Sequence, residues 1–235
     1  MNPSADAPKR GPFNHRERRI LGTLIEKQKT TPENYPMTVL AIATGCNQKS
    51  NRDPITNFDP DDVEEVLESL RRQGLVLLIQ GVGRAQKWRH NLYEVLDLKN
   101  RPAEMAIVAE LLLRGAQTEG ELRSRASRMD PIPDLPTLQT MLEFLAEKGL
   151  VVYLTPPGQK RGVVVTHGLY PADELEKVRQ AHAVGAIETV VSTTVAPRSA
   201  PSEAVDDLRR EVADLREAVR VLTADLQALK TSLGA

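Results

Sequence analysis

One spacing of hydrophobic residues occurs twice along this chain and predicts the same elements each time. Val63, Val66, Leu67 and Leu70 fall on one face of a helix that stops at Gly74. The spacing returns 75 residues later in Leu138, Met141, Leu142, Leu145 and Gly149. Two short β-prone runs follow each stop, at 75–79 and 87–93 in the first copy and at 150–154 and 162–166 in the second. A helix, a glycine stop and a hairpin are typical of the last helix and wing of a winged-helix domain.

Two more helices are expected ahead of the first repeated unit. Asn14 and Glu17 have the spacing of a capping box for a helix that ends near Thr30, and 36–43 is expected to form a second, short helix. The third helix then begins at Pro60, because proline favours the first helical position and acidic residues follow it in the first turn.

The second copy differs in its first helix and in a shorter loop. Residues 103–113 are apolar on nearly every side, which predicts a helix that is buried all round between two modules. Thr118 and Glu121 form another capping box, for a helix through about residue 127. The first copy carries 12 more residues than the second, and they fall in the stretch 45–58.

The longer stretch of the first copy, 45–58, is polar and rich in turn residues. Asn47, Gln48 and Asn51 supply amide donors and acceptors, which are able to read base edges or a peptide backbone. The same groups are able to hydrogen-bond the loop into its own shape. The sequence leaves both interpretations open.

The C-terminal tail has the strictest periodicity in the chain. Its apolar residues alternate spacings of three and four, as in a coiled coil: Val205, Leu208, Val212, Leu215, Val219, Leu222, Leu226, Leu229 and Leu233. Val at the early a positions and Leu at every d position favour a parallel two-stranded coil, and hence a homodimer. One amphipathic helix folded back onto the body is the alternative interpretation.

These patterns predict a mainly α protein with small β-hairpins. We expect a disordered arm at 1–12 and winged-helix domains at 13–98 and 99–184, the second with a short trailing helix at 171–183. A flexible linker is expected at 185–202, and the coiled coil at 203–233. The fold class is therefore two tandem winged-helix domains followed by a parallel coiled-coil helix.

Composition and charge exclude several classes of protein. The formal net charge is −1, so any attraction to nucleic acid has to come from local basic surface. The single cysteine, Cys46, excludes an intramolecular disulfide and is expected to be a small buried residue. The start has no secretory signal and no run is apolar enough to span a membrane, so a cytoplasmic location without membrane contact is expected. No spacing of histidines suits a metal, and no cofactor motif is present.

Several strings of residues point to a known family. They are 17–28 (ERRILGTLIEKQ), 30–36 (TTPENYP), 46–52 (CNQKSNR), 112–118 (LLRGAQT) and 120–125 (GELRSR). Over roughly residues 14–170 the chain resembles the YceH family of bacterial tandem winged-helix proteins. The resemblance implies the two winged-helix domains and assigns no activity, and it does not extend to the linker or the coiled coil.

Charge is distributed unusually for a DNA-binding winged helix. The third helix, from Asp59 to Arg72, carries six acidic residues against two basic ones, which disfavours its entry into the major groove. Basic residues gather elsewhere, and the candidates for phosphate contact are Arg16, Arg19, Lys49, Arg52, Arg84, Lys87, Arg89, Arg123, Arg125, Lys160 and Arg161. Solvated surface charge is the alternative interpretation for each cluster.

Two functions of different classes follow from these features. The first is a dimeric DNA-binding transcriptional regulator that contacts phosphates through basic wings and the arm. The second is a protein-interaction scaffold that docks a basic partner on acidic third helices, through Glu64, Glu65 and Glu68. Catalysis is not expected, because no nucleophile has a partner base in any local motif.

Overall fold

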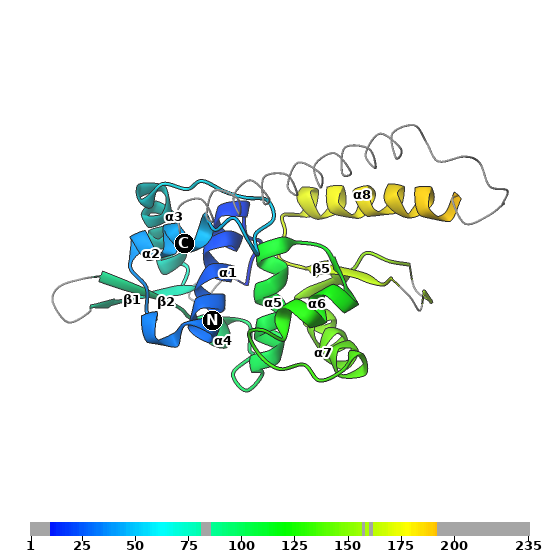
Figure 1. Ribbon diagram of the computed structural model, residues 1–235. Coiled ribbons are helices and arrows are strands. Elements are labelled where there is room, and N and C mark those ends of the chain that lie inside the picture. Colours follow the sequence, from blue (N-terminus) through cyan, green and yellow to red (C-terminus); the bar gives the residue numbers. More distant parts are fainter. Residues whose placement is uncertain (1–9, 81–85, 157, 160–161, 192–235) are drawn as a thin grey trace, which may run out of the picture. The chain divides into compact units, whose positions relative to one another are not determined.

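The computed structural model of this chain describes residues 10–80, 86–156, 158–159 and 162–191. In this part the protein is mainly helical, with one two-stranded and one three-stranded antiparallel sheet (Figure 1). Three helices and a hairpin occur in succession and then occur again, which is a winged-helix-like order. We call residues 13–98 the first repeat and residues 99–171 the second repeat.

The first repeat contains five helical segments and a hairpin among its described residues. They are α1 (His15–Thr30), the 3-10 helix η1 (Pro32–Asn34), α2 (Val39–Cys46), α3 (Pro60–Arg72), β1 (Val76–Gln80), β2 (Gln86–His90) and α4 (Leu92–Val95). The second helix begins later than the predicted 36–43, because Met37 bonds to Trp88 and the Thr38 side chain caps the helix by accepting from the Ala41 N–H. The helix α4 was not predicted.

The second repeat has the same order with one extra strand. Its elements are α5 (Pro102–Arg114), β3 (Gln117–Thr118), α6 (Glu119–Ala126), α7 (Leu135–Glu147), β4 (Val151–Tyr153) and β5 (Val164–His167). The helix α8 (Ala172–Val191) follows it. It is longer than the predicted 171–183, so residues 185–191 continue a helix where a linker was expected.

The predicted helix signals hold in both repeats. Asn14 with Glu17, and Thr118 with Glu121, form the two expected capping boxes. Gly74 and Gly149 end the third helices with φ of 73° and 70°, which glycine adopts without a Cβ clash. The local sequence therefore determines where these helices begin and end.

The two repeats share one hydrophobic core where α1 crosses α5, side by side in Figure 1. Every residue from Ala103 to Leu113 is buried, as the apolar composition of this helix predicts. The crossing is close at Gly22, where an added Cβ would lie 2.9 Å from Leu113 Cγ. A larger side chain at this position would therefore push the helices apart.

Polar contacts also join the first repeat to later parts of the chain. The Phe13 N–H donates to the Leu169 carbonyl at 2.9 Å, and Arg18 forms an ion pair with Glu174 of α8. Lys29 Nζ lies 2.8 Å from Asp130 Oδ2. The first repeat is thus bonded to three later parts of the chain.

A His-x-Leu-Tyr motif ends each hairpin in the same way. It occupies 90–93 in the first repeat and 167–170 in the second. In both, histidine Nδ1 accepts the backbone N–H two residues on, from Leu92 and from Leu169, at 3.2 Å. Burial lowers the pKa of His90 to about 3 and the pKa of His167 well below its usual value. Each repeat therefore contains a neutral, buried histidine.

Several predictions fall outside the described residues. They are the arm at 1–9, the linker at 192–202 and the coiled-coil positions from Val205 to Leu233. Among the described helices, none is long and apolar enough to cross a membrane.

Candidate functional site

The hairpin β1–β2 is anchored to the first repeat through Trp88. The Trp88 side chain is fully buried, and its backbone exchanges hydrogen bonds of 2.7 and 3.0 Å with Met37. The His90 N–H donates to the Tyr35 hydroxyl at 2.7 Å, and burial raises the pKa of Tyr35, so the hydroxyl stays neutral. The hairpin is therefore braced by the segment 35–37.

Lys87 and Arg89 lie on the outer face of this hairpin. They alternate with the buried Trp88, and they pair across the sheet with Ile79 and Leu77. Arg89 is exposed and Lys87 is half-buried, and neither forms a hydrogen bond or ion pair with another described residue. We call Lys87 and Arg89 the wing cations.

Two other predicted DNA contacts, Arg19 and Arg52, require correction. Both are buried, with 1% and 6% of their surface exposed. Arg19 donates to the Pro54 carbonyl, and burial lowers its pKa to about 10. Neither guanidinium reaches a phosphate without local unfolding.

The remaining described candidates are mostly engaged by the protein. Arg16 forms an ion pair of 2.9 Å with Asp62, and Arg125 donates to Gln117 Oε1 at 2.6 Å. Arg123 donates to the carbonyls of Ile132 and Pro133. These three arginines therefore already have partners within the protein.

Lys49 differs from these arginines, because it is exposed and has no partner among the described residues. Arg84, Lys160 and Arg161 lie outside the described residues. The wing cations and Lys49 are thus the predicted contacts that remain available in the part of the chain described.

The exposed face of α3 is acidic, as its sequence predicts. Glu64 and Glu65 are exposed and form no ion pair within the described ranges. Glu68 accepts from Arg71 Nε at 2.9 Å, an exposed pair that contributes little stability. Free carboxylates on this helix would repel phosphate.

The loop 47–59 lies between α2 and α3 of the first repeat and contacts the second repeat, and hydrogen bonds fix its shape. The Asn47 side chain accepts the Phe58 N–H at 2.7 Å and donates to the Phe58 carbonyl at 2.8 Å. Asn51 takes the left-handed conformation, with φ of 59°, and its Oδ1 accepts from Arg114 at 2.7 Å and from Arg128 at 3.2 Å. The interpretation that the loop hydrogen-bonds itself into shape therefore holds for Asn47, whereas Asn51 hydrogen-bonds two arginines of the second repeat.

Arg52 is the centre of this loop. Its Nε donates to the Gly45 carbonyl at 3.0 Å, and its other N–H groups donate to the two Glu26 oxygens, the Asn51 carbonyl and Gln48 Oε1. A guanidinium has five N–H donors, so all of them have an acceptor. Arg52 thus binds the loop to α1 and neutralises Glu26.

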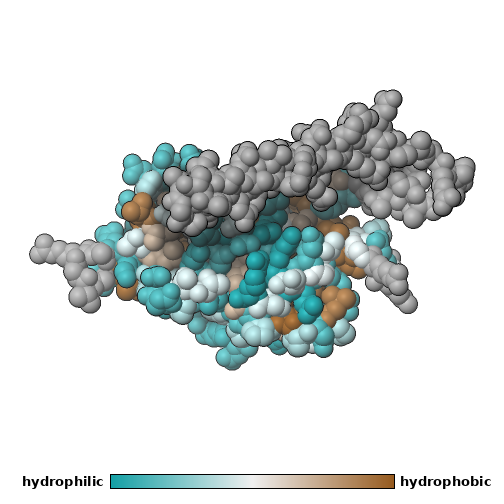
Figure 2. All heavy atoms as spheres, viewed as in Figure 1, coloured by the Kyte–Doolittle hydropathy of each residue, from teal (hydrophilic) through white to brown (hydrophobic). Residues whose placement is uncertain are grey.

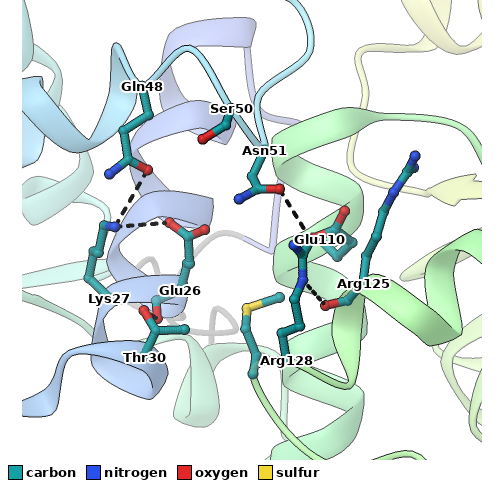
Figure 3. Close-up of a pocket in the computed structure, with 10 residues that line it drawn as sticks. Glu26, Lys27, Thr30, Gln48, Ser50, Asn51, Glu110, Arg125 and Arg128 are labelled. Carbon is teal, nitrogen blue, oxygen red and sulfur yellow. Dashed lines mark hydrogen bonds and ion pairs between the residues drawn. The ribbon is translucent and has the colours of Figure 1, made fainter. Parts of the chain in front are cut away.

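A pocket of about 310 Å³ lies between the repeats beside this loop (Figure 3). The first repeat lines it with Glu26, Lys27, Thr30, Gln48, Ser50 and Asn51. The second repeat lines it with Glu110, Arg125, Arg128 and Met129. Its volume is at the lower end of pockets that hold small molecules.

The pocket walls carry both signs of charge. Figure 2 shows that the described residues on one face of the molecule are mostly hydrophilic. Lys27 Nζ lies 3.7 Å from Glu26 Oε2 and 3.5 Å from Gln48 Oε1, while Glu110 Oε1 lies 3.2 Å from Arg114 Nε. Burial raises the pKa of Glu110 despite this arginine. In Figure 3 the Arg125 guanidinium points away from the other lining groups, toward its bonds with Gln117 and Glu121.

Nucleophilic chemistry has little support at Cys46. The thiol is fully buried and bonded to Thr23 Oγ1, and burial raises its pKa to about 11, so it remains a protonated thiol at neutral pH. Within the described residues, no three histidine, cysteine, aspartate or glutamate side chains are grouped as ligands for a metal ion.

Comparison with known sequences gives the family. The model described as "Protein of unknown function, DUF480" matches residues 13–159. A UPF0502 protein of Rhodopirellula baltica is 46% identical over 199 residues, 84% of this chain and 82% of that protein. The UPF0502 protein YceH of Salmonella paratyphi B is 37% identical over 217 residues, 89% of this chain and 95% of that protein. The chain belongs to the DUF480 family.

The DUF480 match includes the wing cations, the loop 47–59 and the whole pocket lining. It ends before α8 and the heptads at 205–233. The resemblance to YceH that the sequence strings indicate is confirmed.

Sequence reasoning did not find the pocket, because its walls come from α1, the loop, α5 and the end of α6. Glu26 and Lys27 are ordinary surface positions on a helical pattern, and Glu110 lies in an apolar run. One part of the lining was indicated by the sequence: Gln48 and Asn51 belong to the polar stretch 45–58, which is longer in the first repeat.

Proposed function

We propose that this DUF480 protein is a dimeric tandem winged-helix regulator that binds the phosphate backbone of duplex DNA through the wing of its first repeat. The observation that carries the proposal is the pair of wing cations. Lys87 and Arg89 stand on a braced hairpin and pair with no carboxylate of the described chain. Unpaired cations on a rigid surface can neutralise phosphates and release counterions.

The acidic face of α3 limits how far the proposed DNA binding can depend on base sequence. Glu64 and Glu65 oppose insertion of this helix into the major groove, so the proposed contact is largely independent of base sequence. Dimerisation through the heptads of 205–233 would bring two wings to one duplex and raise the local concentration of the second. The proposed role is binding and not catalysis.

The test is a salt titration of DNA binding by the wild-type protein and the double variant Lys87→Ala/Arg89→Ala. We expect weaker binding to every duplex sequence, and a slope of log K against log salt that falls by about 0.9 for each phosphate that is no longer neutralised. Lys177→Ala/Arg179→Ala, on exposed positions of α8, removes the same charge elsewhere and serves as the control. An unchanged slope in the wing variant, or an equal change in the control, contradicts the proposal.

A protein-interaction scaffold is the second candidate, favoured by the same free carboxylates on α3. Changing Glu64, Glu65 and Glu68 to Gln separates the two functions. If DNA is bound nearby, the variant should bind non-specific DNA more tightly, most clearly at low salt. If α3 docks a basic protein, DNA binding stays negligible and a co-purifying partner is lost. Unchanged behaviour in both assays would exclude α3 from both functions.

A further inference from the structure

The pocket between the repeats has carboxylates that the protein has already neutralised. Both Glu26 oxygens accept from Arg52, and Arg52 has no N–H left to donate. Glu110 has Arg114 at 3.2 Å. Neither arginine lines the pocket. The two acidic groups therefore give the cavity little net negative charge.

Several hydrogen-bond donors of the pocket lining have few or no acceptors among the described residues. Within the described ranges, Lys27 Nζ has only the two long contacts of 3.5 and 3.7 Å. Arg128 donates from Nε to the Arg125 carbonyl at 3.3 Å and from one terminal nitrogen to Asn51 at 3.2 Å, which leaves its other N–H groups without an acceptor in the described part of the chain. The Gln48 and Asn51 amide nitrogens likewise have no acceptor among the described residues.

We propose that this pocket binds a small organic anion, whose phosphate or carboxylate oxygens lie between Lys27 and Arg128. The cavity of about 310 Å³ has room for a metabolite-sized molecule. Lys27 belongs to α1 of the first repeat and Arg128 follows α6 of the second, so the anion bridges the repeats (Figure 3). Charge-assisted hydrogen bonds from a lysine and an arginine are the usual means of holding anionic oxygens.

The test is calorimetric titration of the full-length protein with pyrophosphate and, separately, with citrate, at an ionic strength held constant with chloride. We expect saturable binding of one anion per chain, and the anion that binds more tightly identifies the phosphate or the carboxylate class. Lys27→Gln and Arg128→Gln should each weaken binding about tenfold or more, because each removes a charged donor. Arg128→Lys, which keeps the charge, should restore part of the affinity.

Two controls make the result specific to the pocket. Arg72→Gln removes an exposed cation of α3 and should leave the titration unchanged. The wing variant Lys87→Ala/Arg89→Ala should also bind the anion normally, so that failure of the DNA proposal and failure of this one are distinguishable. Thermal unfolding of each variant confirms that it is folded.

The proposal is overturned if neither anion gives a saturable binding isotherm that differs from a titration with chloride alone. It is also overturned if both pocket variants bind as the wild type does, or if the wing variant loses anion binding to the same extent. In the last case the anion would occupy the phosphate-binding wing.

Discussion

Gly22 is the residue on which contact between the repeats depends most directly. It is buried in α1, where leucines of α5 approach its backbone. Glycine weakens a helix interior by about 1 kcal/mol relative to alanine, so its presence here reflects the close crossing.

Replacing this residue tests the crossing. Gly22→Ala places a Cβ 2.9 Å from Leu113 Cγ, and we expect the free energy of unfolding to fall by about 1–2 kcal/mol after the gain in helix propensity is included. Gly120→Ala in α6 is the control, because its Cβ meets nothing within 4 Å and should add up to about 1 kcal/mol. Urea denaturation measures both, and two changes of the same sign would contradict the prediction.

Arg52 gives a second residue-level prediction. Arg52→Gln leaves the mostly buried Glu26 carboxylate without its guanidinium, and the free energy of unfolding should fall by about 3–5 kcal/mol. Arg71→Gln breaks the exposed pair with Glu68 and should change it by less than about 1 kcal/mol. Equal effects in urea melts would mean that the loop bonds are not structural.

At the scale of elements, the two hairpins make stability depend on pH. Burial lowers the pKa of His90 to about 3 and that of His167 in the same direction, while an unfolded histidine titrates near 6.5. The unfolded chain therefore binds protons first as pH falls. The stabilisation is complete above pH 6.5 and is lost progressively below it, by about 2 kcal/mol at pH 5 for His90, and His167 contributes in the same direction.

This dependence is measured by urea denaturation between pH 7 and pH 5. The variant His167→Asn keeps a side-chain acceptor for the Leu169 N–H but does not titrate, so it should lose less stability over this range than the wild type does. His182→Asn on α8 is the control. If the free energy of unfolding of His167→Asn falls with pH as steeply as that of the wild type, His167 does not contribute to the pH dependence.

The elements that sequence predicts well are those with local signals. Capping residues at Asn14 and Thr118, and the stops at Gly74 and Gly149, are readable because each acts within one turn of a helix. The second helix was misplaced because Trp88, distant in sequence, engages Met37. A long-range backbone pairing leaves no periodic signal.

The candidate site was less predictable than the fold. Arg19 and Arg52 belong to a residue type that is mostly exposed, and the acceptors of α1, α2 and the loop 47–59 explain their burial. The repeated His-x-Leu-Tyr is readable in the sequence but was not predicted, because the β-prone run 87–93 includes its first copy. Comparison of the two copies position by position would have found it.

At the scale of the whole molecule, the heptad tail predicts assembly. We expect the wild type to be a dimer. Leu215→Asp with Leu222→Asp places unpaired charges at d positions, so light scattering of this variant should report a monomer. Ala224→Asp, at an outward f position, should remain dimeric. A wild-type monomer at micromolar concentration would contradict the prediction.

The contacts of α1 also set an order of events during synthesis. Residues 13–98 emerge from the ribosome before α5 does, so the surface around Gly22 stays uncovered until residues 102–114 emerge. The contacts of Phe13 with Leu169 and of Arg18 with Glu174 form later still, because these partners are synthesised after α5. At a synthesis rate of about 5–20 residues per second, the interval between Gly22 and α5 is on the order of ten seconds. During this interval the apolar face of α1 is exposed to other proteins. A nascent chain stalled near residue 98 should therefore be a better chaperone substrate than one stalled after α8.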